Sequence, residues 1–207
     1  MENQESEFIQ ENGTGKPETV STFQKEILET LRDFSFWLIG ILLIFVLIFR
    51  IVVVSGPSMK NTLQNGDYLL LLSNVFYGEP QRGDVIVAAK DSFRDGEPII
   101  KRVIATAGQK VNIDFTAGIV YVDDVALEEP YTLTPTNLQE GVEFPLVVED
   151  GCVFAMGDNR NDSKDSRSLD IGQIDCREIL GKAIFLLFPG VDEIQDKRDF
   201  GRIGAVS

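Results

Sequence analysis

The 207-residue sequence contains no histidine, and this absence excludes more chemistry than any other feature of its composition. A Ser-His-Asp triad needs an imidazole to accept the serine proton near neutral pH, so any serine nucleophile in this chain must use another base. The usual zinc-binding sets require histidine or several cysteines. With two cysteines and no histidine, we expect neither a metal site nor a cofactor.

Cysteine and positive charge are also scarce. Cys152 and Cys176 lack CxxC spacing and are either unlinked small core residues, which is the commoner case, or a disulfide if their part of the chain faces an oxidising compartment. The 33 Asp and Glu outnumber the 19 Lys and Arg, for a formal net charge of −14. Most of such a surface repels a polyanion, and no cluster of Lys and Arg offsets this, so we expect no nucleic acid as a partner.

The first 33 residues predict a tail that precedes any folded domain. Residues 1–18 are polar, carry almost nothing to bury, and predict a disordered segment. From about residue 21 to residue 33, apolar side chains at helical spacing predict an amphipathic helix that lies along a membrane surface. The members of this pattern are Phe23, Ile27, Leu28, Leu31 and Phe34.

Residues 34–54 form an apolar run with a single charge, Arg50. As a helix this run would be about 32 Å long, close to the ~30 Å hydrocarbon core of a bilayer. It is apolar on every face and has Trp37 where an interfacial anchor would sit, so it predicts one transmembrane helix rather than a core helix. No small-x-small site follows it, which indicates an uncleaved anchor. The flanking positive charges balance, so charge does not decide the orientation.

Residues 55–207 predict a mainly β domain, with an antiparallel sheet of barrel-like or layered form and few helices. Gly, Pro and Asp separate its short apolar runs. A shift toward Thr, Glu and Pro predicts a small inserted subdomain over residues 112–149, with a hairpin turn at Asp123-Asp124. The runs that predict strands are DYLLLL, GDVIVAA, PIIKRVIAT, KVNID, GIVYVDDVAL, CVFAMG and KAIFLLF.

Two segments hold candidates for nucleophile and base. In SGPSM, Ser58 follows a Gly-Pro bend that can project a side chain into a cleft, although such a turn is usually only a turn. In PIIKRVIAT, Lys101 stands among apolar residues. It is either an edge-strand lysine that reaches water, or a buried lysine whose desolvation disfavours the ammonium. A lysine pKa lowered from about 10.4 to about 8 would leave roughly one amine in ten neutral at pH 7, enough to serve as a base.

A third segment, GDNRNDSKDSR, runs from Gly157 to Arg167. Clusters of Asn, Asp, Ser and Gly are usually solvated loops. This loop, however, directly follows the apolar run CVFAM, and loops that begin at the end of a buried strand are common places for functional sites.

Four blocks, SGPSMKNTL, RGDVIV, IKRVIATAGQKV and GDNRNDSKDSR, occur in this order after one apolar span. Together they resemble the type I signal peptidase family from Val52 to about Pro189, and the short segment between the last two blocks resembles a Gram-positive-like subset. The resemblance implies a membrane-anchored serine endopeptidase with a Ser-Lys dyad. Its substrates would be the signal peptides of secreted preproteins, cut after an Ala-x-Ala-like site.

The resemblance also implies roles for individual residues. Ser58 corresponds to the nucleophile, Lys101 to the general base, and Ser163 to the serine whose hydroxyl orients the lysine amine. The main-chain N–H of Ser58 would be one oxyanion donor; some members place a serine hydroxyl at the position of Gly56, so the second donor stays open. The charged residues that brace the site are Asp158, Arg102, Asp165 and Arg167. The apolar pockets for small substrate side chains would be lined by Val52, Val54, Met59, Leu63, Val87, Ile99 and Ile100.

One residue departs from the family pattern, since Asn61 replaces a proline. We expect the replacement to loosen the turn without removing a catalytic atom. The family function also sets the orientation of residues 34–54 in the cell membrane: the tail is cytoplasmic, and the domain from residue 55 works on the outer face, near the secretion translocon. Two alternatives stay open, namely a self-cleaving repressor with the same Ser-Lys chemistry, which would need a DNA-binding region, and an anchored, inactive β domain that binds partners.

Overall fold

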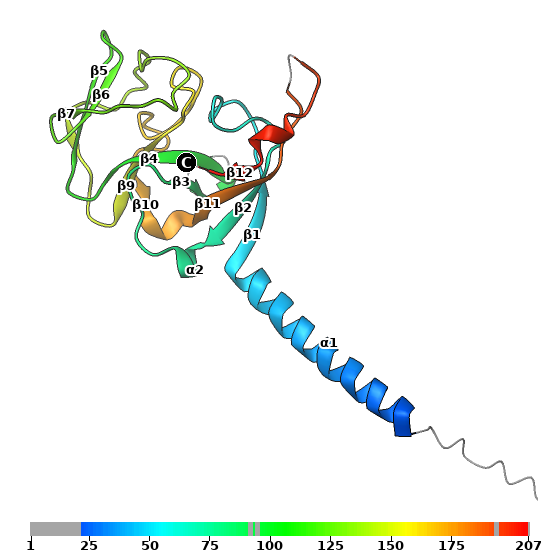
Figure 1. Ribbon diagram of the computed structural model, residues 1–207. Coiled ribbons are helices and arrows are strands. Elements are labelled where there is room, and N and C mark those ends of the chain that lie inside the picture. The colour runs from blue at the N-terminus through cyan, green and yellow to red at the C-terminus, as the bar shows by residue number, and fades with distance from the viewer. Residues whose placement is uncertain (1–21, 91–92, 94–95, 193–194, 207) are drawn as a thin grey trace, which may run out of the picture. The chain divides into compact units, whose positions relative to one another are not determined.

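The computed structural model describes residues 22–90, 93, 96–192 and 195–206 (Figure 1). The chain divides into two units, Met1–Leu43 and Ile44–Ser207. The tail predicted over residues 1–18 lies outside the described residues. The mainly β fold predicted for the second unit is confirmed, because two antiparallel sheets account for most of its regular structure.

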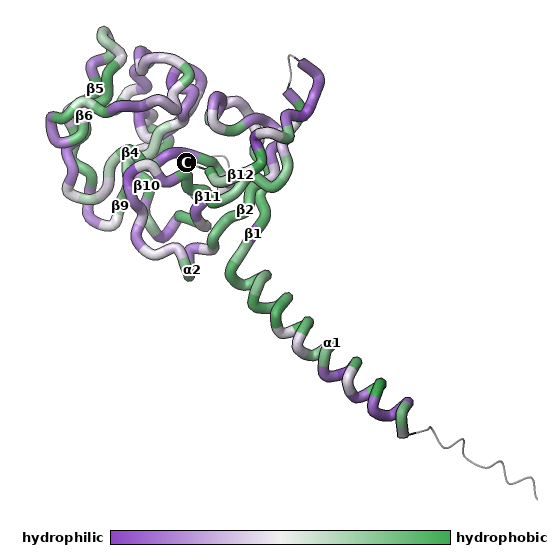
Figure 2. The backbone as a smooth tube through the Cα atoms, in the orientation of Figure 1, coloured by the Kyte–Doolittle hydropathy of each residue, from purple (hydrophilic) through white to green (hydrophobic). Residues whose placement is uncertain are grey.

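Helix α1 extends over Thr22–Ile48. Its residues become mostly hydrophobic toward the C-terminal end, as the hydropathy colours of the backbone in Figure 2 show. Among the described residues, one helical stretch, Phe23–Ile48, is long and apolar enough to cross a membrane. The helical pattern predicted from about residue 21 and the apolar run that follows it form one continuous helix.

The predicted helix over residues 34–54 is wrong at its C-terminal end. Strand β1, Phe49–Val53, follows α1 directly and pairs antiparallel with β2, Tyr68–Ser73. The run from Ile51 is rich in β-branched residues, which favour a strand, and β2 supplies the hydrogen-bond partners for its backbone. A uniformly apolar run does not distinguish these two states by composition, so the partner strand decides.

The larger sheet has eight strands in the order β1-β2-β11-β3-β4-β9-β10, with β12 paired to β11. Its two most buried strands are β3 and β4, which lie side by side at its centre. The remaining bounds are α2 Asn74–Tyr77, β3 Val85–Ala88, β4 Ile99–Thr106, β9 Cys152–Met156, β10 Ile174–Asp175, η2 Cys176–Glu178, β11 Ile179–Phe188, η3 Phe200–Arg202 and β12 Gly204–Ala205.

The smaller sheet has four strands in the order β7-β6-β5-β8. These are β5 Lys110–Asp114, β6 Ile119–Val122, β7 Val125–Ala126 and β8 Leu146–Val147. Figure 1 shows β5, β6 and β7 grouped away from β11 and β12. The predicted hairpin is confirmed, since Asp123 and Asp124 have φ angles of 51° and 64° and join β6 to β7, as a type I′ turn requires.

The inserted subdomain therefore begins at Lys110 rather than at residue 112, and it is not an independent domain. Its buried residues share one core cluster with residues of the larger sheet, among them Ile104 and Phe154. The two cysteines, in β9 and η2, are free and half-buried. Burial raises the pKa of both thiols, which keeps them neutral.

Candidate active site

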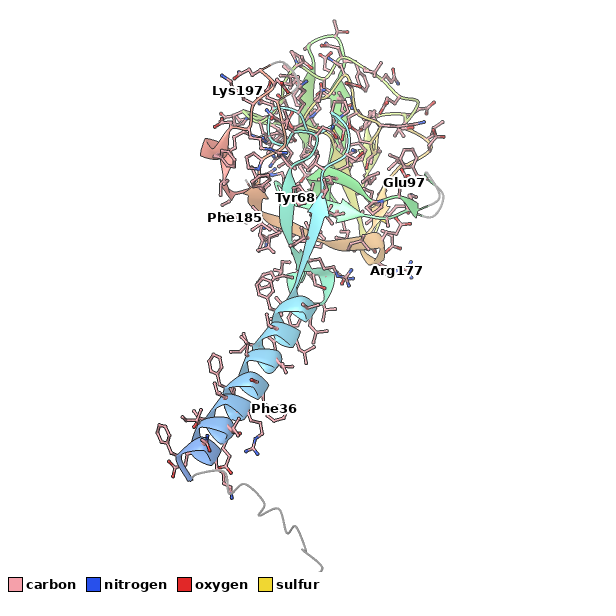
Figure 3. All side chains as sticks on the ribbon, turned by 90° about the vertical axis from the view of Figure 1, so that its right-hand side faces the viewer. Phe36, Tyr68, Glu97, Arg177, Phe185 and Lys197 are labelled. Carbon is pink, nitrogen blue, oxygen red and sulfur yellow. The ribbon has the colours of Figure 1, made fainter. Side chains whose placement is uncertain are left out.

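A cleft of about 650 Å³ opens on the larger sheet. One wall is the segment 52–59, which includes the end of β1, and a second is the segment 97–101, which leads into β4. Figure 3 labels Glu97 in this second wall. A third wall consists of Leu138, Glu140 and residues 161–164, so the cleft joins the three sequence blocks that hold the predicted site.

Ser58 stands in the loop between β1 and β2. The loop is closed at its base by backbone hydrogen bonds from Val54 N to Asp67 O (2.9 Å) and from Gly66 N to Val54 O (2.9 Å). The Asp67 carboxylate is fully buried and accepts bonds from the N–H groups of Gln64 and Gly190, both at 2.7 Å. These bonds fix the loop, and Ser58 faces the cleft from it.

Lys101 lies in the central strand β4 and is 4% exposed, so it is not an edge lysine that reaches water. Its Nζ donates to Ser58 Oγ at 2.9 Å and to the Ile100 carbonyl oxygen at 2.9 Å. The structure thus brings together two residues that are 43 positions apart in sequence, at hydrogen-bond distance and beside a cleft.

Ser163 lines the same cleft and is 6% exposed. Its Oγ has no hydrogen-bond partner among the described residues, so the predicted bond to the Lys101 amine is not present in this structure. The hydroxyl packs against Gly157, where a Cβ atom would collide with both Ser163 Oγ and the carbonyl oxygen of Ser58. Only glycine fits at this crossing.

Arg102 and Asp158 form the first of the expected ion pairs. The salt bridge is a bidentate fork: Arg102 Nε donates to Asp158 Oδ1 at 2.9 Å and a terminal guanidinium nitrogen donates to Oδ2 at 2.8 Å. Both side chains are buried. Thr62 Oγ1, from the loop that carries Ser58, donates to Asp158 Oδ2 at 2.5 Å. The Arg102 guanidinium also lies 4.1 Å from the centre of the Tyr131 ring, a cation–π contact.

Asp165 and Arg167 form the second expected pair, again a fork, with both contacts at 2.8 Å and no exposure of either side chain. Asp165 Oδ2 also accepts the Gly157 N–H at 2.9 Å. Arg167 donates to the carbonyl oxygen of Arg160 at 2.7 Å. This pair therefore holds the 157–167 loop in one conformation.

A third buried pair was not predicted. Arg160 is fully buried and forms a fork with Glu129 at 2.7 and 2.8 Å, and it also bonds Thr136. It ties the segment after β7 to the 157–167 loop. Arg160 could have been noticed in the sequence, because it is the arginine of the GDNR block. Glu129 could not, because no recognisable motif surrounds it.

Gly56 does not serve as an oxyanion donor in this structure. Its N–H donates to Asn65 Oδ1 at 3.1 Å, and glycine has no side chain to offer a second donor. The Ser58 carbonyl oxygen accepts the Asn159 N–H at 3.0 Å. Asn61 does not leave its turn unsupported: it has a φ of 99°, which proline cannot adopt, and its side-chain amide donates to the Tyr131 carbonyl oxygen at 3.1 Å.

Five of the seven predicted pocket residues line the cleft: Val52, Val54, Met59, Ile99 and Ile100. Leu63 and Val87 do not. They are 1% and 0% exposed and belong to the core cluster beneath the cleft, because their places on the loop and on β3 turn them inward. The lining residues that the sequence did not indicate include Phe93, Pro98, Leu138, Glu140 and Lys164.

Within the described residues, no group of three or more Cys, Asp or Glu side chains could hold a metal ion. At the Ser58–Lys101 contact, the cleft presents a hydroxyl and an amine. A hydroxyl hydrogen-bonded to a buried amine can act as a nucleophile toward a carbonyl carbon.

Comparison with known proteins identifies the family. The family model described as signal peptidase, peptidase S26, matches residues 27–188. The probable signal peptidase I-1 of Synechocystis sp. is 39% identical over 144 residues, which cover 66% of this chain and 69% of that protein. The signal peptidase I S of Bacillus subtilis is 32% identical over 183 residues, which cover 84% of this chain and 95% of that protein.

A solved structure of a signal peptidase I from Enterococcus faecalis is 28% identical, with a TM-score of 0.42, and it covers 51% of this chain and 97% of that one. The family model spans most of the chain by itself, including all four sequence blocks and both residues of the hydrogen-bonded serine and lysine. The chain therefore belongs to the signal peptidase family, peptidase S26, whose activity is the hydrolysis of peptide bonds.

Proposed function

We propose that this chain is a membrane-anchored endopeptidase that removes signal peptides from preproteins with a dyad of Ser58 and Lys101. The observation that carries the proposal is the 2.9 Å hydrogen bond between Lys101 Nζ and Ser58 Oγ, made by an amine that is 4% exposed. Burial disfavours the charged form of an amine, and a neutral amine can accept the serine proton. In a chain without histidine, this is the base that the geometry offers.

In the first half-reaction the Lys101 amine accepts the hydroxyl proton while Ser58 Oγ bonds to the carbonyl carbon at the cleavage site. The carbon–nitrogen bond then breaks, and the Lys101 ammonium returns the proton to the leaving amine. In the second half-reaction the same amine deprotonates a water molecule, which hydrolyses the acyl ester. The products are the carboxylate of the signal peptide, the free amine of the mature protein and the original hydroxyl.

The Ser58 N–H is the proposed oxyanion donor. The Asn159 N–H, bonded to the Ser58 carbonyl oxygen, supports it by fixing the peptide unit on the other side of Ser58. A donor aimed at the developing oxyanion contributes about 3 kcal/mol to catalysis. Gly56 supplies no second donor because Asn65 occupies its N–H.

The substrate would lie extended between the segment 52–56 and the start of β4, and alternate side chains would face the same wall. Val54, Met59 and Ile100 make that wall apolar, and each is at least nine-tenths buried, so the wall offers a short apolar surface rather than polar partners. Small residues at the first and third positions before the cut fit this surface, as in an Ala-x-Ala site.

The lipid bilayer is the second proposed partner, with α1 as its single span. The charge-free part of α1, residues 34–48, is about 22 Å long, shorter than the ~30 Å hydrocarbon core. The second unit carries a surface that can also meet lipid: Val53, Tyr68, Phe188 and Phe200 are each more than 40% exposed. They are contiguous, since Tyr68 is the register partner of both Val53 and Phe188, and Phe188 stacks on Phe200.

Figure 3 labels Tyr68 on β2 and, on the neighbouring β11, Phe185, which is also exposed. An apolar surface of this kind beside Ser58 would place the nucleophile at the membrane edge, where a signal peptide leaves the bilayer. The proposed orientation follows: residues 1–33 cytoplasmic, residues 55–207 on the outer face, close to the translocon that delivers the preproteins.

The test uses the full chain in detergent and a peptide with an Ala-x-Ala site. We expect Ser58→Ala and Lys101→Met to abolish cleavage. Lys110→Met, which removes a strand lysine outside the cleft that is paired with Asp124, should leave the rate unchanged. Cleavage that survives Lys101→Met would refute the dyad, and peptide binding with no cleavage by the unmodified chain would favour the inactive binding domain instead.

A further inference from the structure

The cleft has two apolar walls and one polar wall. The segments 52–56 and 98–100 present mostly apolar side chains. The third wall, from Leu138 to Glu140 and from Asn161 to Lys164, holds two side-chain oxygen atoms that are buried and have no hydrogen-bond partner among the described residues, Ser163 Oγ and Glu140 Oε2. Buried polar atoms are nearly always paired, so an unpaired one in a cleft points to a ligand group that completes it.

The segment that carries Glu140 is held firmly. The Leu138 carbonyl oxygen accepts a hydrogen bond from Arg167 at 3.0 Å, and the Val142 N–H donates to the Arg167 carbonyl oxygen at 3.0 Å. Gly141 forms a β-bridge with Ser168. The Glu140 carboxylate is therefore preorganised in the wall, and a ligand that meets it does not have to order a loop first.

The charges in the cleft favour a cation. Of the charged residues that the structure describes, Glu97, Glu140 and Asp162 line it together with Lys101, which is bonded to Ser58, and Lys164, which forms an ion pair with Asp170. Burial raises the pKa of Glu140, and the nearby charge of Asp165 raises it further, while Arg167, a backbone hydrogen bond at Asp165 and Lys164 lower it. The ionised form of such a carboxylate is unfavourable when the cleft is empty, and a positively charged ligand group beside it would stabilise that form.

We propose that Glu140 is a specificity-determining residue of this peptidase, which favours a lysine or arginine at the substrate position between the two small residues that precede the cut. The inference rests on the proposed function. In an extended peptide, the first and third residues before the cut face one side, so the second faces the other. The apolar walls suit the two small residues, which leaves the polar wall to the residue between them.

The experiment compares three peptides, Ala-Lys-Ala, Ala-Met-Ala and Ala-Glu-Ala at the cleavage site, with the full chain in detergent. A hydrogen bond to a charged group corresponds to about tenfold or more in kcat/KM, so we expect the native chain to cut Ala-Lys-Ala about tenfold faster than Ala-Met-Ala, and Ala-Glu-Ala slowest. Glu140→Gln should bring the lysine and methionine peptides to similar rates while the Ala-Met-Ala rate persists.

Glu143→Gln is the matched control, because Glu143 is an exposed carboxylate three residues away that does not line the cleft. It should behave like the native chain. The proposal is overturned if Glu140→Gln keeps the lysine preference, if Glu143→Gln loses it equally, or if lysine is favoured only at another position of the peptide.

Two further measurements separate this proposal from the cleavage mechanism. The Ala-Met-Ala rate reports the proposed function without Glu140. Binding of the same peptides to a Ser58→Ala chain, followed by fluorescence anisotropy, reports the lysine preference without cleavage, and equal affinities there would refute the role of Glu140. Since only the ionised carboxylate attracts lysine, the preference should also fall as the pH is lowered through the raised pKa of Glu140.

Discussion

The C-terminal segment is predicted to position the loop that carries Ser58, although it lies beyond the residues that match the family model, 27–188. Arg202 in η3 forms a fork with the buried Asp67 at 2.7 and 3.0 Å, and also donates to the Thr62 carbonyl oxygen at 3.2 Å. Asp67 closes the loop that carries Ser58. Replacing Arg202 by Ala leaves Asp67 with two backbone donors and no counter-charge, in a site with no exposure.

The expected cost follows from the burial of the pair. Hydrogen bonds to charged groups contribute about 1.5–3 kcal/mol each, and leaving a buried charge without its partner costs about 3–5 kcal/mol. The Arg202 side chain is 18% exposed and two donors remain, so we expect a loss of about 2–3 kcal/mol. In a chain of this length that lowers Tm by about 5–10 °C. Thermal unfolding of the full chain in detergent measures the shift.

Activity should fall more than stability alone explains. At a temperature well below both Tm values, Arg202→Ala should lower kcat more than it raises KM, because the loop presents Ser58 less accurately to a substrate whose binding walls are intact. Arg202→Lys keeps the charge without the fork and should restore part of the rate. The control is Arg177→Ala, which removes a similar fork to Asp175 at the surface, where Arg177 is 89% exposed; its Tm and kcat should stay native. Equal behaviour of the Arg202 and Arg177 variants would refute the reasoning.

Three other outcomes are expected. Gly157→Ala should abolish cleavage, because its Cβ would displace the Ser163 hydroxyl and the nucleophile's carbonyl; native activity in a folded variant would contradict the close approach. Ser163→Asp should stabilise the ammonium form of Lys101 and so move the acid limb of the pH–rate profile to higher pH. An unmoved acid limb would show that the side chain at position 163 does not influence Lys101. Burial would raise the pKa of Asp84, but hydrogen bonds from Lys182 and from the Tyr77 hydroxyl outweigh this effect and hold the pKa below 3.8. Its stabilisation is present above that value and lost as the pH falls through the lower folded pKa, so Asp84→Asn should lower Tm more at pH 7 than in acid below that pKa; an equal loss at both would refute this.

Much of the second unit could be predicted from sequence, because its information is local. The strands alternate with turn residues, and Asp123 and Asp124 are among the few residues that accept a positive φ without glycine. The end of α1 could not be predicted in this way. Apart from Arg50, residues 49–53 are as apolar as those before them, and pairing with β2, later in the sequence, makes them a strand.

The candidate site likewise has parts that sequence motifs predict and parts that depend on the folded structure. Ser58 and Lys101 are found from motifs, but their 2.9 Å contact depends on how β4 packs beneath the loop. Leu63 has the same chemistry as the residues that line the cleft, and its inward direction is a property of the folded turn. Glu140 belongs to no motif. The burial of its Oε2 atom and its place in the cleft are properties of the folded chain, which a linear pattern does not contain.

Strand β4 shows how a chain without histidine could hold the proposed base, Lys101, next to strong charges. Successive side chains of a strand point to opposite faces, so Lys101 and Arg102, although adjacent, serve different environments. Arg102 meets Asp158 on its face, with both groups buried and forked. On the other face, Lys101 Nζ donates to Ser58 Oγ and to the Ile100 carbonyl oxygen, which are neutral acceptors. A carboxylate within the same reach would stabilise the ammonium and remove the base. The carboxylate that braces the loop is therefore useful because β4 keeps it on the other face.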